Sequence, residues 1–158
     1  MAVSSELIAL VERRFALPLH GIHGTAHWQR VHAIGLRLAE MTGADPETVE
    51  LFAYLHDSRR LEDGWDLDHG RRAADFAKSL QGSVFELPAG NLQHLTYACA
   101  FHSDGLTEAD ITVQTCWDAD RLDLGRIGIQ PDPACLCTSA AQDPVVIRWA
   151  VRRSQAGR

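Results

Sequence analysis

Histidine is frequent in this chain, with eight residues among 158, and some of the histidines accompany aspartates. His27, the adjacent pair His56 and Asp57, and Asp120 are the residues best suited to chemistry. Imidazole nitrogens and carboxylate oxygens are ligands for divalent ions such as Mn, Fe, Co, Ni and Zn. Taken singly, each residue has an ordinary explanation as a capping, surface or hydrogen-bonded core residue. Together they could hold an ion if the fold brings them to one place.

The apolar residues recur with the spacing of α-helices along nearly the whole chain. Val31, Ile34, Leu38 and Met41, for example, fall at i, i+3, i+7 and i+10. No convincing alternating strand, repeat or linker interrupts this pattern. The sequence therefore predicts an all-α bundle that forms a single domain over residues 1–158. The predicted helices cover residues 4–15, 25–43, 46–56, 68–80, 91–101, 107–122 and 144–153.

Capping residues set several of these boundaries. Thr25 is expected to cap the second helix, Asp45 the third and Asp68 the fourth. A Thr-x-x-Asp capping box over residues 107–110 is expected to begin the sixth. Residues 125–137 are predicted to be a loop with one short helical turn.

The predicted helices place the candidate ligands at their ends. His27 falls in the first turn of the second helix, His56 and Asp57 at the C-terminal end of the third, and Asp120 near the end of the sixth. Ligands from packed helices can converge in the core of a bundle. Burying a carboxylate there without partners would be costly, so a cation beside it is favoured.

Three segments resemble the motifs of the HD-domain superfamily. Residues 27–31 (HWQRV) are similar to its His-x-x-Arg-Val motif, residues 52–57 (FAYLHD) to its apolar run ending in His-Asp, and residues 118–123 (DADRLD) to its Ala-Asp-Arg-Leu segment. The motifs stand in the order of the family, and the resemblance spans residues 20–130.

The resemblance implies an HD-type helical fold and a metal ion bound by His27, His56, Asp57 and Asp120. Most members of the family hydrolyse phosphate esters, often nucleotides. Asp118 competes for the last ligand position, but Asp120 occupies the Asp of Ala-Asp-Arg-Leu. Asp118 is therefore expected beside the ligands rather than among them.

Some HD proteins bind a second ion through two further histidines. His69 and His102 are the candidates by their order in the chain, and each lies at a predicted helix terminus. Alternatively, His69 orders the start of its helix and His102 bonds a closing loop. His94 is expected to be an ordinary core or surface residue.

The residues around the candidate ligands suggest a phosphate site. Arg59 and Arg60 follow the His-Asp pair, and a guanidinium there could bind a phosphate through two hydrogen bonds. His23 could bind the phosphate or protonate a leaving group. The alternatives are a solvated helix end for at least one arginine and a loop position packed on Trp28 for His23.

We therefore expect a metal-dependent phosphohydrolase that uses Mn, Fe, Co, Ni, Zn or Mg to activate water. Asp57 or Asp120 is expected to hold that water in line, with Arg59 and His23 offsetting charge at the phosphate. One metal site is expected and a second is open. The alternatives are an HD-type di-iron oxygenase, which has the same order of six ligands, and a non-catalytic regulatory HD module.

Composition limits the partners. The net charge of −6 argues against a nucleic-acid polymer, because binding one requires a basic face, so a small phosphorylated substrate is expected. The chain shows neither a signal peptide nor an apolar stretch long enough for a membrane helix. The four cysteines suggest reduced thiols in the cytoplasm, with a zinc site at Cys135 and Cys137 as the weaker alternative. A homodimer is compatible with the sequence.

Overall fold

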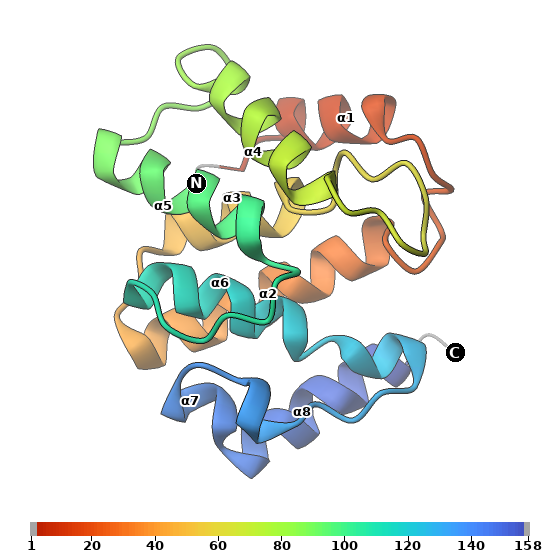
Figure 1. Ribbon diagram of the computed structural model, residues 1–158, viewed down its shortest axis with the longest axis vertical. Helices are drawn as coiled ribbons and strands as arrows, with labels where there is room; N and C mark the ends of the chain where they lie inside the picture. Colours follow the sequence, from red (N-terminus) through yellow and green to blue (C-terminus); the bar gives the residue numbers. More distant parts are fainter. Residues whose placement is uncertain (1–2, 157–158) are drawn as a thin grey trace.

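The computed structural model describes residues 3–156, which are helical over most of their length (Figure 1). The predicted all-α class is confirmed, since these residues contain no strand and only an isolated bridge between Gln81 and Phe85. No helix among them is long and apolar enough to cross a membrane. The elements in chain order are α1 (Ser5–Arg14), α2 (Thr25–Thr42), α3 (Pro46–Leu55), α4 (His69–Leu80), α5 (Ala89–Phe101), α6 (Ile111–Arg121), the 3₁₀ turns η1 (Leu124–Ile127) and η2 (Pro133–Cys135), α7 (Ser139–Gln142) and α8 (Pro144–Gln155).

The helix α3 lies at the centre of the bundle. It packs against α2, α5 and α6, while α1 and α4 lie on one side of this group and α7 and α8 on the other (Figure 1). Every residue of α3 from Thr48 to Leu55 is buried. A helix that is mostly apolar on all sides is stable only when other helices surround it. The end of α3, where His56 and Asp57 follow, is therefore placed deep in the molecule.

Two glycines allow neighbouring helices to approach closely. A Cβ atom on Gly35 of α2 would lie 2.5 Å from Cγ1 of Val49 on α3. A Cβ atom on Gly70 of α4 would lie 2.6 Å from the carbonyl oxygen of Cys99 and 2.7 Å from that of Ala100, both on α5. The absence of a side chain at Gly70 thus sets the separation of α4 and α5.

Of the N-cap residues predicted for α2 and α3, one is confirmed and one is wrong. Asp45 caps α3 as expected, since its carboxylate accepts a hydrogen bond from the backbone N–H of Thr48 at 2.9 Å. The predicted cap Thr25 is wrong, because the N-cap of α2 is Gly24. A Cβ atom on Gly24 would lie 2.0 Å from the carbonyl oxygen of Leu19, so the tight turn before α2 admits only glycine there. The hydroxyl of Thr25 donates instead to that same carbonyl oxygen.

Asp68 is the N-cap residue of α4, as predicted, but its side chain makes no capping hydrogen bond. The capping box over residues 107–110 is wrong, because α6 begins at Ile111 and Asp110 is its N-cap, with its carboxylate accepting from the backbone N–H of Thr112. Asp110 directly precedes the first residue of α6, so its carboxylate can reach the free N–H groups of the first turn, whereas Thr107 lies four residues before that turn.

The segment between α6 and α8 holds more helix than the loop that the sequence predicts. It contains η1, η2 and α7 in place of one short turn. Asp118 of α6 organises it: its carboxylate accepts hydrogen bonds from the backbone N–H of Cys137 at 2.7 Å and from the backbone N–H and hydroxyl of Thr138 at 2.9 and 2.7 Å. The C-terminal helices are thus attached to the bundle by a buried carboxylate.

We expect Gly70→Ala to lower the free energy of unfolding by about 1–3 kcal/mol, because the added methyl group would push α4 away from two backbone carbonyls of α5. Urea denaturation followed by circular dichroism would measure the change. Gly90→Ala is the matched control, since a Cβ atom at Gly90 in α5 meets nothing within 4 Å. That control should be neutral or slightly stabilising. Equal stability of the two variants would contradict the close approach at Gly70.

Candidate metal centre

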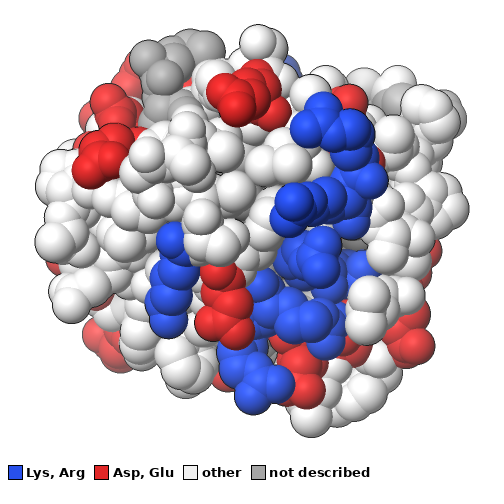
Figure 2. Space-filling model, turned by 90° about the horizontal axis from the view of Figure 1, so that it is seen from above, with Lys and Arg blue, Asp and Glu red and all other residues white. Residues whose placement is uncertain are grey.

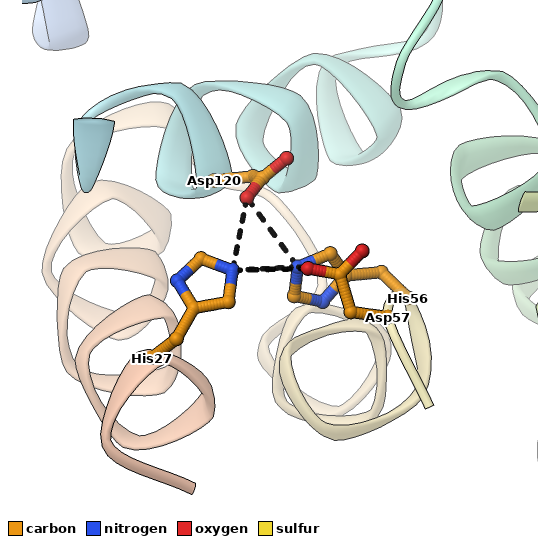
Figure 3. A group of neighbouring side chains, drawn as sticks. All are labelled: His27, His56, Asp57 and Asp120. Carbon is orange, nitrogen blue, oxygen red and sulfur yellow. Dashed lines mark hydrogen bonds and ion pairs between the residues drawn. The ribbon is translucent and has the colours of Figure 1, made fainter. Parts of the chain in front are cut away.

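His27, His56, Asp57 and Asp120 converge on one point in the core, from the start of α2, the end of α3 and the end of α6 (Figure 3). The Nε2 atoms of His27 and His56 are 3.1 Å apart. Oδ1 of Asp120 lies 3.2 and 3.3 Å from these two nitrogens, and Oδ2 of Asp57 lies 3.3 Å from each. Ligand atoms bound about 2.0–2.2 Å from one ion lie roughly 3 Å from one another. The four side chains are therefore spaced as ligands of a single ion.

A second group of side chains meets the other oxygen of Asp57. The Nε2 atoms of His69 and His102 are 2.9 Å apart and lie 3.4 and 3.3 Å from Oδ1 of Asp57. His69 opens α4 and His102 follows α5, so the close approach at Gly70 brings the two imidazoles together. Asp57 thus presents one oxygen to each pair of histidines.

Hydrogen bonds to backbone carbonyls on the far side of the ring fix the orientation of three of the four imidazoles, those of His56, His69 and His102. The Nδ1 atom of His56 lies 3.0 and 3.1 Å from the carbonyl oxygens of Phe52 and Ala53. The Nδ1 atoms of His69 and His102 lie 2.6 and 2.7 Å from the carbonyl oxygens of Asp66 and Cys99. A carbonyl oxygen only accepts, so each Nδ1 carries a proton and donates it. In a neutral ring, the lone pair is then on Nε2, which faces the centre.

This donor set fits divalent ions. Two imidazole nitrogens that present lone pairs to each other at about 3 Å repel unless a proton or a metal ion lies between them. Both histidine pairs have this arrangement, and each pair has a carboxylate oxygen beside it. The arrangement suits a borderline divalent transition metal at each pair.

The electrostatics of the first group also favour positive charge. Burial disfavours the charged form of His56, yet the carboxylates of Asp57 and Asp120 raise its pKa to about 10. Burial disfavours ionisation of both aspartates too, but the His56 imidazolium holds the pKa of each carboxyl well below its ordinary value. The cavity therefore attracts cations, whether protons or metal ions.

Asp123 is a functional residue that sequence reasoning missed. Its Oδ2 lies 2.7 Å from Nδ1 of His27, and its Oδ1 accepts from Nε of Arg30 at 2.7 Å. A carboxylate behind a metal-binding imidazole fixes its orientation and raises its basicity. The sequence does contain a signal for Asp123, because His27 and Arg30 are three residues apart on one helix face and Asp123 is three residues after Asp120.

The expectation that Asp118 lies beside the ligands is wrong, since it binds Cys137 and Thr138 instead.

One of the comparisons with known proteins bears on the fold. No protein-family model matches the chain, and no curated protein matches it. A crystal structure described as a predicted HD superfamily hydrolase from an uncultured Thermotogales bacterium superposes with a TM-score of 0.72. The two chains share 22% identity, and the match covers 92% of this chain and 83% of the other. The chain has the HD-type helical fold.

On this HD fold, the two predicted phosphate-binding residues lie in different places. The guanidinium of Arg59 lies over the ring of Phe76, 5.4 Å from its centroid, and outside both groups of histidines. Its neighbour Arg60 donates from Nε to Oδ1 of Asp57 at 3.2 Å. The expected position of Arg59 beside the metal ligands is therefore wrong, and Arg60 is the arginine that contacts Asp57, because the chain turns after α3 and consecutive side chains point in different directions.

His23 lies close to the centre of the HD fold. Its Nδ1 is 2.7 Å from Oδ1 of Asp63, and its ring centroid is 6.3 Å from that of His27. Burial lowers its pKa from the ordinary value, although the carboxylates of Asp57 and Asp63 act in the opposite direction. The ring is therefore neutral near pH 7, with Nδ1–H donating to Asp63 and Nε2 able to accept a proton.

The other sequence candidates lie outside the centre. His94 lies 3.7 Å from Asp110, away from both groups, as the sequence suggested. All four cysteines are free thiols, and none joins a group of metal-ligating side chains among residues 3–156. Cys99 and Cys116 are buried, whereas Cys135 is exposed and Cys137 is partly exposed.

We expect purified protein to carry divalent metal that His56→Ala and Asp57→Ala lose, because each change removes a central ligand. His69→Ala and His102→Ala should lower the metal content from two ions per chain to one. Elemental analysis by mass spectrometry after gel filtration measures both effects.

His20→Ala is the control for those variants, since His20 is exposed and belongs to neither group. Full metal content in folded His56→Ala and Asp57→Ala would show that the ligand assignment is wrong. Unchanged content in the His69 and His102 variants alone would limit the centre to one ion.

Asp123→Asn should weaken metal binding by about 10- to 100-fold, because an amide supports the Nδ1–H of His27 less well than a carboxylate does. Competition with a chromophoric chelator would measure the affinity. Asp118→Asn is the matched control: it also replaces a buried aspartate near Asp120, but its contacts are with the C-terminal segment. It should lower stability and leave the metal affinity unchanged. Equal affinities in the two variants would contradict the role of Asp123.

Proposed function

We propose that this protein is a metal-dependent hydrolase that releases phosphate from a small phosphate ester or nucleotide. The observation that carries the proposal is the sharing of Asp57 between two pairs of inward-facing imidazoles. When bound, divalent ions supply a Lewis acid that polarises the phosphoryl group and lowers the pKa of water. The remaining steps depend on side chains of this chain.

In this proposal, Asp120 orients the attacking water. Its side chain is 17% exposed, whereas the side chains of His27 and His56 have no exposure. One of its oxygens faces the two imidazoles and the other points away from them (Figure 3). The outer oxygen can accept a hydrogen bond from water and so aim the water lone pair at phosphorus.

In this proposal, Arg60 holds the phosphate. It lines a depression of about 230 Å³ together with His69 and Ser103, beside the second pair of histidines. Its guanidinium is steadied by Asp57 and by the carbonyl oxygens of Glu62 and Gly64. A guanidinium fixed in this way can stabilise the charge that develops on a phosphoryl group.

The size and lining of the depression favour a small substrate with an organic part. Trp65 and Leu67 form part of the wall and are 82% and 78% exposed, so they offer apolar surface beside the phosphate position. His23 can accept a proton at Nε2 and return it to a leaving group. A net charge of −6 does not favour a nucleic-acid polymer.

An HD-type di-iron oxygenase is the second candidate, because six ligands that share one carboxylate also suit two iron ions. Arg60 beside Asp57 favours phosphate chemistry over it. A regulatory module without activity is the third candidate and is less favoured, since every candidate ligand is in place.

The test is release of inorganic phosphate from a panel of nucleotides and sugar phosphates, in air and under argon, with Mn, Co, Ni, Mg or Fe added in turn. A hydrolase needs no O₂ and tolerates ions that do not change oxidation state, so we expect equal rates in both atmospheres. Iron-dependent O₂ uptake, with no phosphoester turned over, would contradict the proposal.

In the same assay, Arg60→Ala should lower kcat/KM by about 10-fold or more, as expected for a lost hydrogen bond to a charged phosphate. Arg60→Lys should restore only part of the loss, since an ammonium supplies the charge without the planar fork. Arg13→Ala, which removes an exposed arginine of α1, is the control and should leave kcat/KM unchanged.

A further inference from the structure

Three arginines from separate parts of the chain surround a second depression, on another face of the turn that carries Arg60. They are Arg14 at the end of α1, Arg59 after α3 and Arg72 in α4, and with Asp75 and Phe76 they line a volume of about 310 Å³. Figure 2 shows Lys and Arg side chains gathered on the face that contains α1 and α4. This concentration occurs in a chain whose net charge is −6.

Phe76 forms a floor that holds two of the guanidinium groups. The Cζ atoms of Arg14 and Arg59 lie 5.7 and 5.4 Å from the centroid of its ring. The ring itself is only 7% exposed. Cation–π attraction of this kind orients a guanidinium but leaves its N–H groups free to donate elsewhere. Two arginines are thus brought together by one aromatic side chain.

The positive charge in this depression is poorly compensated. Within the described part of the chain, neither Arg14 nor Arg59 forms an ion pair, and Asp75, which also lines the depression, pairs with neither. Arg72 is paired with Asp66 at 2.6 Å and donates from Nε to the backbone carbonyl of Arg59. Like charges that line one depression repel, and an anion among them would relieve the repulsion.

We propose that Arg14, Arg59 and Arg72 form a binding site for the phosphate group of a small anion, distinct from the metal centre. Planar guanidinium forks match the oxygens of a phosphate, and the several acceptor oxygens of a phosphate can engage guanidinium groups from more than one side at once. The two depressions have no lining residue in common. The ion pair between Arg72 and Asp66 lies between them, with Asp66 on the side of the metal centre.

Inorganic phosphate is the probe for this site, titrated calorimetrically into the metal-loaded protein. Arg14→Gln and Arg59→Gln should each abolish one phosphate-binding event or weaken it by about 10-fold or more. Arg60→Gln and Arg13→Gln should retain that event: the first changes the metal centre, and the second removes an equal charge from the same helix as Arg14. Both test positions are at least partly exposed, so the variants should fold, as thermal unfolding would verify.

Three outcomes would overturn the proposal. If only Arg60→Gln loses phosphate binding, the anion binds at the metal centre alone. If Arg13→Gln weakens binding as much as Arg14→Gln, the effect is that of general surface charge. If phosphate binds equally to all four variants, the cluster contributes nothing. The comparison of Arg60 with Arg59 also separates this site from the proposed hydrolase activity, since either can fail without the other.

Discussion

The carboxylate of Asp57 lies almost completely buried among four imidazoles. The packing of the bundle depends on giving this buried charge hydrogen-bonding and cationic partners. A buried carboxylate without partners would strongly destabilise the fold. Here each oxygen faces one pair of histidines, with the Arg60 guanidinium as a further partner. The protein thus holds a charged group in its core by surrounding it with groups that can share a cation. Without this carboxylate, the two histidine pairs would lose the negatively charged group that they share.

Meeting this requirement fixes how the helices pack. The carboxylate enters from the end of α3, so α3 must be central, and the burial of its residues from Thr48 to Leu55 makes it so. His27 must arrive from α2, and Gly35 allows α2 to lie close against α3. His69 and His102 must meet across α4 and α5, which Gly70 permits. Small residues at helix crossings are therefore as necessary to the centre as the ligands themselves.

Sequence patterns predicted the helices well because apolar spacing reports which face of each helix is buried, and this chain buries most of its helices in one core. The convergence of His27, His56, Asp57 and Asp120 followed from motif order. The partners of those ligands were harder to predict. Residues two apart on a helix point in nearly opposite directions, so Asp118 faces away from Asp120, while Asp123 returns to the same side. Predicting these partners requires the angular position of each residue around the helix axis, which the order of the motifs does not give.

Arg59 was misplaced for a related reason. After α3 ends, the backbone continues in short turns, with Ser58 N–H donating to the carbonyl of Leu55 and Arg60 N–H to that of Asp57. Neither helical nor strand periodicity applies to such turns, so the direction of a side chain depends on contacts that no local pattern contains. The sequence predicts only one short turn between α6 and α8, and α7 was not predicted because its N-cap, Thr138, is held by the distant carboxylate of Asp118.

Two of the four central histidines are also the residues at which helices stop. His56 is the C-cap of α3 and His102 the C-cap of α5, and each ring bonds a carbonyl oxygen of the turn that it ends. Inserting or deleting one residue within either helix would rotate its end by about 100° and shift it by about 1.5 Å. The ligand and the helix terminus would then be lost together. Changes in length should therefore be excluded from α3 and α5, which gives these two helices a fixed length in any functional variant of the chain.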